Sequence, residues 1–312
     1  MNEKTKLESI YPLLTPKILS AVQFIPEFER TQIQEIRMRI FRKLTVTMFG
    51  KEYFVSGDGR LTRNYSEGVD IIREDIDYAY QRAFRCSLHS FAREIAEGYI
   101  TYDGGNRVGF CGTAILSRDA ERRVENVKHI SSVNIRIARE CLGCGDEIYN
   151  KAFEKGAASL IIAGPPSSGK TTVLRDICRN LGQRERIALI DERNEIAAVS
   201  EGAAQNSVGM LTDIFSSYSK YDGIMTAVRV MSPQVLVCDE IGAKEDAKAL
   251  EYAINSGVKL IVTAHAENFD DLRHRPVISK LMKDKVFNYG AILGTGPLCG
   301  KLTGFYKLKE LD

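Results

Sequence analysis

Hydrophobic positions follow two different patterns along the chain, and the change falls near residue 144. Beyond it, apolar residues gather in short, nearly continuous runs at 160–163, 187–190, 235–238 and 260–262. Strands that are buried on both faces of a parallel sheet have this composition, whereas half-buried strands alternate. Segments with helical spacing separate the runs. The pattern predicts an α/β domain over residues 144–312, with a mainly parallel sheet that is covered by helices.

The first 143 residues mix helical and strand periods. Apolar residues recur at intervals of three or four over 16–40, which predicts a largely helical segment. A second helical segment is predicted over 70–97, where Ile72, Ile76, Tyr80 and Phe84 fall on one face.

Strands are predicted between and after these helices. Residues 44–49 alternate apolar side chains with Thr, and 133–137 alternate as well. The segments 99–101 and 108–116 flank the sequence Asp-Gly-Gly-Asn at 103–106, which is suited to a hairpin turn because glycine accepts positive φ. We therefore expect a smaller α+β domain over 1–143, with a linker at 141–145.

Residues 164–171 read Gly-Pro-Pro-Ser-Ser-Gly-Lys-Thr, which fits the phosphate-loop pattern G-x-x-x-x-G-K-[ST]. The loop follows a predicted strand (159–163) and opens a predicted helix (171–181), so its amide groups and the helix N-terminus can surround phosphate oxygens. Lys170 is expected to reach the β- and γ-phosphates, and Thr171 to place its hydroxyl on Mg²⁺. The expected nucleotide-binding residues are Gly164, Pro165, Pro166, Ser167, Ser168, Gly169, Lys170, Thr171 and Thr172.

A second candidate site is the acidic pair Asp239 and Glu240, directly after the apolar run 235–238. A buried strand that ends in two carboxylates needs something positive to meet them. Ligands of parallel sheets bind at the carboxyl edge, where such a strand ends. We expect Asp239 to hold Mg²⁺, and Glu240 to orient and deprotonate the attacking water.

Two other polar positions follow predicted strands, and spacing alone leaves their roles open. His265 comes after the run 260–262, where a polar side chain can sense the γ-phosphate, but a lone histidine is more often a surface or satisfied core residue. Glu192 comes after the run 187–190, where charges are usually solvated.

Composition indicates the class of protein and its cellular compartment. The 312 residues are 44% hydrophobic and 27% charged, with a net charge of +2, which is typical of a globular protein with two domains. We expect neither a secretory signal nor a membrane span, because no apolar run follows Met1 and none reaches membrane length. The seven scattered cysteines then indicate reduced thiols in the cytoplasm, and the single Cys-x-x-Cys at 141–144 is interpreted as a turn rather than a zinc site.

Taken together, these motifs resemble the secretion-type ATPases, a RecA-like family that includes type II and type IV secretion and pilus-retraction ATPases. The matching features are the phosphate loop, an acidic box at 191–195, Arg229 before the strand that ends in Asp239 and Glu240, and Thr-Ala-His-Ala at 263–266. Segments 35–39, 104–109, 133–139 and 189–196 resemble the stage III sporulation protein AA family of endospore-forming bacteria, over nearly the whole chain.

The resemblance implies a RecA-like P-loop ATPase that forms a homo-oligomeric ring, a hexamer, in the mother-cell cytoplasm. The ring would energise or assemble a membrane-embedded channel complex built from other proteins of the sporulation A operon, and these partners would hold it at the membrane. By position, Glu192 would polarise water or Mg²⁺, and His265 would contact the γ-phosphate region. Arg229 is counted with the catalytic residues, and Arg136 and Arg139 would reach a neighbouring subunit's nucleotide.

Other P-loop functions stay open at this point. A nucleic-acid ATPase of the helicase-loader type would show a basic face with stacking aromatics, but the charge is nearly balanced and the chain has no Trp, so no nucleic acid is expected. A GTPase would carry an Asn-Lys-x-Asp motif, which the sequence lacks. A kinase would need a small-molecule acceptor, and a scaffold would bind ATP without significant turnover.

Overall fold

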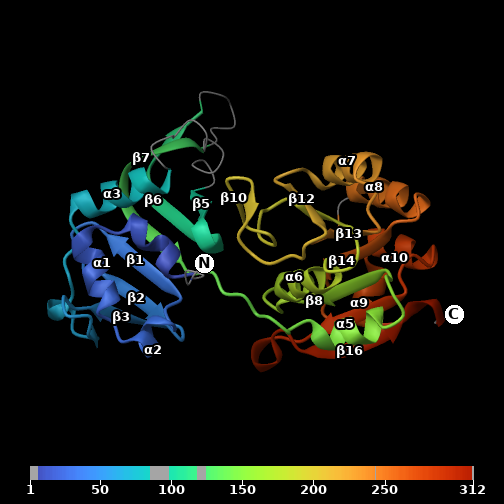
Figure 1. Cartoon of the computed structure of the whole chain (residues 1–312), viewed down its shortest axis with the longest axis horizontal. Helices are drawn as coiled ribbons and strands as arrows, with labels where there is room; N and C mark the ends of the chain where they lie inside the picture. The colour runs from blue at the N-terminus through green and yellow to red at the C-terminus, as the bar shows by residue number, and fades with distance from the viewer. Residues whose placement is uncertain (1–5, 85–97, 118–123, 243, 311–312) are drawn as a thin grey trace. The chain divides into compact units, whose positions relative to one another are not determined.

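The computed structural model describes residues 6–84, 98–117, 124–242 and 244–310 (Figure 1). The chain divides into two compact units, Met1–Arg139 and Glu140–Asp312. Among the described residues, no helix is both long enough and apolar enough to cross a bilayer.

The N-terminal unit is built on a seven-stranded antiparallel sheet, in the order β4-β3-β2-β1-β7-β6-β5. Buried and more exposed side chains alternate along β1, so one face of the sheet packs into a core and the other does not. The strands are β1 (Glu35–Arg39), β2 (Thr45–Met48), β3 (Lys51–Val55), β4 (Leu61–Thr62), β5 (Tyr99–Tyr102), β6 (Asn106–Leu116) and β7 (Val124–Arg136).

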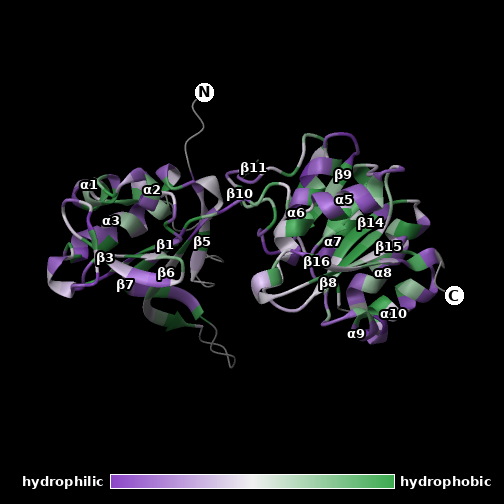
Figure 2. Ribbon diagram, turned by 90° about the horizontal axis from the view of Figure 1, so that it is seen from below, coloured by the Kyte–Doolittle hydropathy of each residue, from purple (hydrophilic) through white to green (hydrophobic). Residues whose placement is uncertain are grey.

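Helices cover one face of this sheet (Figure 2). Ile18 and Val22 of α1 and Ile76 of α3 are buried with Ile36 of β1 and Ile135 of β7. The helical elements are η1 (Glu8–Leu13), α1 (Pro16–Gln23), α2 (Glu27–Arg30), η2 (Tyr65–Glu67), α3 (Arg73–Ala83) and η4 (Asp103–Gly105). The predicted α+β class and the predicted hairpin between β5 and β6 are confirmed.

The prediction of a largely helical segment over 16–40 is wrong in its second half. The helix α1 ends at Gln23, the short helix α2 follows Pro26, and β1 begins at Glu35. Buried Ile36 and Met38 are two residues apart, which is the strand period, and β1 pairs with both β2 and β7. The helix predicted over 70–97 is α3, Arg73–Ala83; residues 85–97 of that prediction lie outside the described residues.

The C-terminal unit is built on a second seven-stranded sheet, in the order β12-β9-β13-β14-β8-β15-β16. Neighbouring strands run parallel from β12 to β15, and only the edge strand β16 is antiparallel to its neighbour. The strands are β8 (Leu160–Gly164), β9 (Ile187–Asp191), β12 (Thr212–Ser216), β13 (Val235–Cys238), β14 (Lys259–His265), β15 (Tyr289–Leu293) and β16 (Leu302–Lys307); β10 (Val199–Ser200) and β11 (Ala203–Ala204) form a separate small hairpin.

Helices lie on both faces of this sheet, around strands that Figure 2 shows as hydrophobic. One buried cluster joins the sheet to α5 and α6, and the other joins it to α7, α8, α9 and α10. The α/β prediction for this part of the chain is therefore confirmed. The helical elements are α5 (Asp146–Phe153), α6 (Lys170–Leu181), α7 (Lys220–Val230), α8 (Lys244–Asn255), α9 (Phe269–His274), α10 (Pro276–Lys283), η5 (Gly296–Leu298) and η6 (Leu308–Glu310).

The parallel arrangement brings four strand ends to one edge of the sheet. β8, β14, β13 and β9 are consecutive neighbours, and His265 at the end of β14 pairs in register with Gly164 at the end of β8. The segments that follow these strands carry the phosphate loop, His265, the Asp239–Glu240 pair and Glu192. The fold therefore places the main sequence-predicted candidates beside one another.

Candidate active site

The phosphate loop is shaped by its two motif glycines. A Cβ atom on Gly164 would lie 2.4 Å from the hydroxyl oxygen of Ser168, so a side chain at residue 164 would displace the loop. Gly169 has φ of 85° and forms the N-cap of α6, a left-handed conformation that glycine adopts without strain. The loop thus turns directly into the N-terminus of α6, whose first amide groups have no partner within the helix.

Lys170 is buried at the start of α6 and is held against the loop. Its ammonium donates hydrogen bonds of 2.9 Å to the carbonyl oxygens of Gly164 and Pro165. Burial lowers the pKa of Lys170, while the carboxylates of Asp239 and Glu240 oppose that shift. The lysine is a desolvated positive charge in the centre of the loop.

The end of β13 meets the start of α6 through one hydrogen bond. The hydroxyl of Thr171 donates to Asp239 Oδ2 at 2.6 Å. Thr263 of β14, a fully buried residue, donates its hydroxyl to the other oxygen of Asp239 and accepts a 2.8 Å bond from the amide of Glu240. Sequence reasoning had quoted Thr263 only as part of the Thr-Ala-His-Ala match at 263–266 and had given it no role.

Glu240 has both carboxylate oxygens engaged. Its backbone is left-handed, with φ of 51°. One oxygen lies 3.0 Å from His265 Nε2, and the other lies 2.8 Å from Arg193 Nη1. His265 Nδ1 in turn lies 3.3 Å from Lys170 Nζ. The structure therefore brings His265 into the site, and it adds Arg193, which sequence reasoning had quoted only as part of the acidic box.

Glu192 reaches the same place from the end of β9. Its carboxylate accepts a 2.9 Å bond from Lys220 at the start of α7. Burial opposes the charge on Lys220, but the hydrogen bond and ion pair with Glu192 raise the pKa of the ammonium. Glu192, Lys220, Asp239 and Glu240 line a hollow of about 20 Å³, which is enough for a water molecule.

Asp191, the first carboxylate of the acidic box, holds the loop that carries Glu192 and Arg193. It is buried and accepts bonds from the amides of residues 195, 196 and 197 at 2.9, 3.0 and 2.8 Å. Burial raises its pKa, and the three amide bonds oppose that shift. Arg175 of α6 donates to the carbonyls of residues 195 and 196 at 2.6 and 2.8 Å, so both ends of the loop are fixed.

A larger pocket of about 500 Å³ adjoins the start of α6. Its lining comes from three segments: Cys141–Ile148, the first turn of α6 with Gly169, Thr172 and Val173, and the β15–β16 connection at 299–302. The connection touches the phosphate loop directly, because the Cys299 thiol donates to the carbonyl of Ser167 at 3.2 Å and the Gly300 amide donates to Ser168 at 2.9 Å.

The predicted arginines lie elsewhere. Arg229 is exposed in the last turn of α7. Lys220, the first residue of this helix, contacts Glu192, so the helix carries Arg229 away from the site toward the opposite edge of the sheet. Arg136 is at the end of β7 in the N-terminal unit, 62% exposed and 3.3 Å from Glu35. Arg139 donates a 2.7 Å bond to the carbonyl of Gln32 in the same unit.

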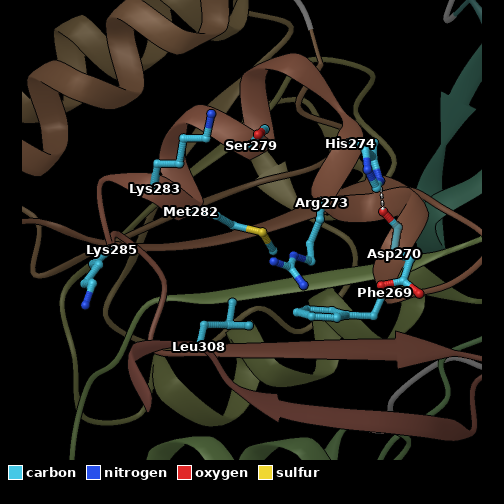
Figure 3. Close-up of a pocket in the computed structure, with 9 residues that line it drawn as sticks. All are labelled: Phe269, Asp270, Arg273, His274, Ser279, Met282, Lys283, Lys285 and Leu308. Carbon is cyan, nitrogen blue, oxygen red and sulfur yellow. Dashed lines mark hydrogen bonds between the residues drawn. The ribbon is translucent and has the colours of Figure 1, made fainter. Parts of the chain in front are cut away.

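A third hollow, of about 640 Å³, lies against α9, α10 and Leu308, the first residue of η6. Figure 3 shows Arg273 and Met282 pointing into the hollow, with Phe269 and Leu308 on the side next to β16. Phe269 stacks on Tyr306 at 4.1 Å between ring centroids. The lining residues of this hollow belong to none of the four segments that carry the predicted site.

Comparison with known proteins places this geometry in a family. A family model described as sporulation stage III, protein AA, matches residues 3–311. Stage III sporulation protein AA of Bacillus subtilis (strain 168) is 32% identical over 288 residues, which make up 90% of this chain and 89% of the relative.

Solved structures show the same fold at low identity. The pilus retraction motor PilT with bound ADP matches with a TM-score of 0.57 at 13% identity, over 86% of this chain and 77% of that chain. The Yersinia pseudotuberculosis ATPase DotB matches with a TM-score of 0.56 at 15% identity, over 91% and 76%. These matches confirm the RecA-like secretion-ATPase fold that the motifs predicted. Since the family model covers nearly the whole sequence, this chain belongs to the sporulation stage III protein AA family.

Proposed function

We propose that this chain hydrolyses ATP in a Mg²⁺-dependent reaction. The observation that carries the proposal is the contact between the phosphate loop and the acidic residues after β13. The Thr171 hydroxyl donates a 2.6 Å hydrogen bond to Asp239, and Glu240 is the next residue in the sequence. A hydroxyl at the start of the loop helix and an acid at the end of a nearby strand are the protein ligands that P-loop ATPases offer to a nucleotide-bound metal.

The remaining side chains supply electrostatics and proton transfer. Lys170 binds the β- and γ-phosphates in place of the carbonyl oxygens that it now contacts. Glu240 orients the attacking water and accepts its proton, and His265 fixes one oxygen of that carboxylate. Glu192 lines the same water-sized hollow and orients the water from the side of β9.

Thr171 at the start of α6 and Asp239 after β13 fit a magnesium ion. Mg²⁺ prefers oxygen ligands and usually takes one or two from the protein, with phosphates and water completing its shell. Thr171 and Asp239 would hold it, and the ion would neutralise charge on the phosphates. The hydroxyl of Ser168, which is buried without a hydrogen-bond partner in the part of the chain that the structure describes, is a further loop donor that a bound nucleotide could satisfy.

The 500 Å³ pocket beside Thr172 is the candidate for the base and ribose. Its size suits a small ligand, and Leu142, Ile148, Val173 and Leu302 give it an apolar lining. The pocket adjoins the first turn of α6, where the ribose and base of a nucleotide would extend from phosphates held in the loop. This position supports ATP as the ligand rather than a simple phosphate.

Family membership supports the setting of the reaction. The family is named for stage III of sporulation. The PilT structure, which has a similar fold, is described as a pilus retraction motor with bound ADP. We infer a homo-oligomeric ring, hexameric as the resemblance implies, in the mother-cell cytoplasm. It energises or assembles a membrane-embedded channel complex made by the other A-operon proteins, with Arg136 and Arg139 available to act between subunits.

Phosphate release by the purified full chain tests the proposal. Lys170→Ala should reduce turnover to background because the phosphates lose their buried positive partner. Glu240→Gln should keep nucleotide binding but reduce kcat by about 100-fold or more, the usual contribution of a general base. Removal of Mg²⁺ with a chelator should have the same effect as Lys170→Ala. Lys155→Ala, which changes an exposed lysine after α5, is the matched control and should behave as wild type.

Other results point to other functions. ATP binding without phosphate release above background, in wild type and Glu240→Gln alike, would indicate a scaffold that binds ATP without turnover. ADP formation that requires an added small-molecule acceptor, with transfer of the phosphoryl group to that acceptor and no release of inorganic phosphate, would indicate a kinase.

A further inference from the structure

A line of side chains links the phosphate loop to the loop after β9. Lys170 Nζ lies 3.3 Å from His265 Nδ1, and His265 Nε2 lies 3.0 Å from Glu240 Oε1. The line ends at Arg193, whose Nη1 lies 2.8 Å from Glu240 Oε2. Arg193 is therefore separated from the phosphate-binding lysine by two side chains, and it lines the same small hollow as Glu192 and Asp239.

The bond between Arg193 and Glu240 is one that a competing anion can replace. The arginine side chain is 64% exposed, and exposed ion pairs contribute little to stability. A guanidinium also presents paired N–H donors that match phosphate oxygens. A triphosphate bound at Lys170 would place several negative charges beside Arg193, against the single charge of Glu240.

The same bond conflicts with the role proposed for Glu240. A general base must accept a hydrogen bond from the attacking water at one of its carboxylate oxygens. Both oxygens of Glu240 are engaged, one with His265 and the other with Arg193, so a water that this carboxylate is to orient needs one of them released. A γ-phosphate that attracts Arg193 would free that oxygen when substrate is present.

We propose that Arg193 is a γ-phosphate-binding residue, which exchanges Glu240 for the terminal phosphoryl group when ATP occupies the site. This inference rests on the proposed ATPase function. It makes Arg193 the group that distinguishes ATP from ADP, because only ATP carries the competing phosphate. The loop that carries Arg193 is held by Asp191 and Arg175, so the side chain moves from a fixed base.

A double-mutant cycle on binding tests the exchange. The affinities of ADP and of the non-hydrolysable β,γ-imido analogue of ATP are measured for wild type, Arg193→Ala, Glu240→Gln and the double variant. Arg193→Ala should weaken the analogue about tenfold or more, the scale of a charge-assisted hydrogen bond, and leave ADP unchanged. Arg193→Lys should retain part of the affinity. Arg275→Ala, which removes an exposed pair with Asp271 at 3.4 Å, is the matched control and should change neither affinity.

Glu240→Gln separates the exchange from simple attraction. Removal of this carboxylate frees Arg193 and removes a negative charge near the phosphate, so the analogue should bind more tightly. In the Arg193→Ala background only the loss of negative charge near the phosphate remains, so Glu240→Gln should increase the affinity for the analogue by a clearly smaller factor than it does in wild type. For ADP, the effects of the two substitutions on affinity should be additive.

The outcomes distinguish this inference from the function on which it rests. If wild type binds neither nucleotide, the proposed ATPase function fails and the role of Arg193 fails with it. If both nucleotides bind but Arg193→Ala weakens them equally, or the two substitutions act additively on the analogue, the ATPase proposal stands and the exchange is overturned.

Discussion

At the scale of single residues, the site depends on a few polar side chains that each serve two neighbours. Thr263 bonds to Asp239 and to the amide of Glu240, so it sets the position of the proposed metal ligand and of the proposed base together. It also supports Glu240 in its left-handed backbone conformation, which costs free energy for a non-glycine residue. One buried hydroxyl thereby positions both proposed acids.

Thr263→Val should test this support. Valine has nearly the same shape but leaves one Asp239 oxygen and the Glu240 amide without their partner, so we expect the free energy of unfolding to fall by about 1–3 kcal/mol. Urea denaturation measures that loss, and phosphate release should fall with kcat more affected than KM. Thr263→Ser keeps the hydroxyl and should retain most of the activity. Equal activity of the valine and serine variants would show that the hydroxyl does not position the acids.

At the scale of helices and strands, the local sequence pattern predicts an element correctly where that pattern is typical of only one kind of secondary structure. The phosphate loop and the buried runs of β8, β9, β13 and β14 could be predicted because burial on both faces leaves a continuous apolar signal. The segment 33–40 was mispredicted because isoleucines spaced by three or four also occur in an alternating strand, and the pairing of β1 with β2 and β7 decides between helix and strand.

Contacts between distant elements could not be predicted in the same way. Arg193 and Glu240 lie in loops after different strands, and the parallel pairing of β9 with β13 brings them together. The acidic box divides similarly, because Asp191 turns inward to bind loop amides while Glu192 faces Lys220. Nothing in the spacing of these charges assigns one to structure and another to the site.

The elements around the proposed base pocket carry thiols that can report on its occupancy. Cys141, Cys144 and Cys299 line the pocket, and Cys141 and Cys299 are exposed. Burial, with a contribution from neighbouring Cys141, raises the pKa of Cys144 to about 12, so this thiol should react slowly. Buried Cys178 also has a pKa raised to about 12 by desolvation.

Alkylation rates of individual cysteines, followed by mass spectrometry, test the pocket. We expect Mg-ATP to slow alkylation at Cys141 and Cys299, because the base and ribose cover the pocket. Inorganic triphosphate occupies the phosphate loop alone and should leave Cys141 at its original rate. Cys111, which is exposed on β6 in the N-terminal unit, is the internal control. Equal protection of Cys141 by ATP and by triphosphate would place the base elsewhere.

At the scale of the whole molecule, each unit has its own sheet and its own buried core, and the proposed catalytic groups divide between them. The phosphate loop, both strand-end acids and His265 belong to the C-terminal unit, whereas Arg136 and Arg139 belong to the N-terminal unit. A ring offers a reason for this division, because a cyclic arrangement of identical subunits brings one surface of each subunit against a different surface of the next.

Mixed rings test whether an arginine of the N-terminal unit acts on a neighbour's nucleotide. Arg136 is 62% exposed and is bound only by a 3.3 Å ion pair with Glu35 among the contacts of the described residues, so it is available to stabilise charge in the transition state of an adjacent subunit. Arg136→Ala subunits should then reduce the phosphate release of wild-type subunits with which they assemble, by more than dilution alone. Lys128→Ala, which changes an exposed cation on the same strand, should only dilute. Mass measurement with and without Mg-ATP must first show that both variants enter rings. If Arg136→Ala rings form and lose activity only in proportion to the fraction of variant, then this arginine does not act across a subunit boundary.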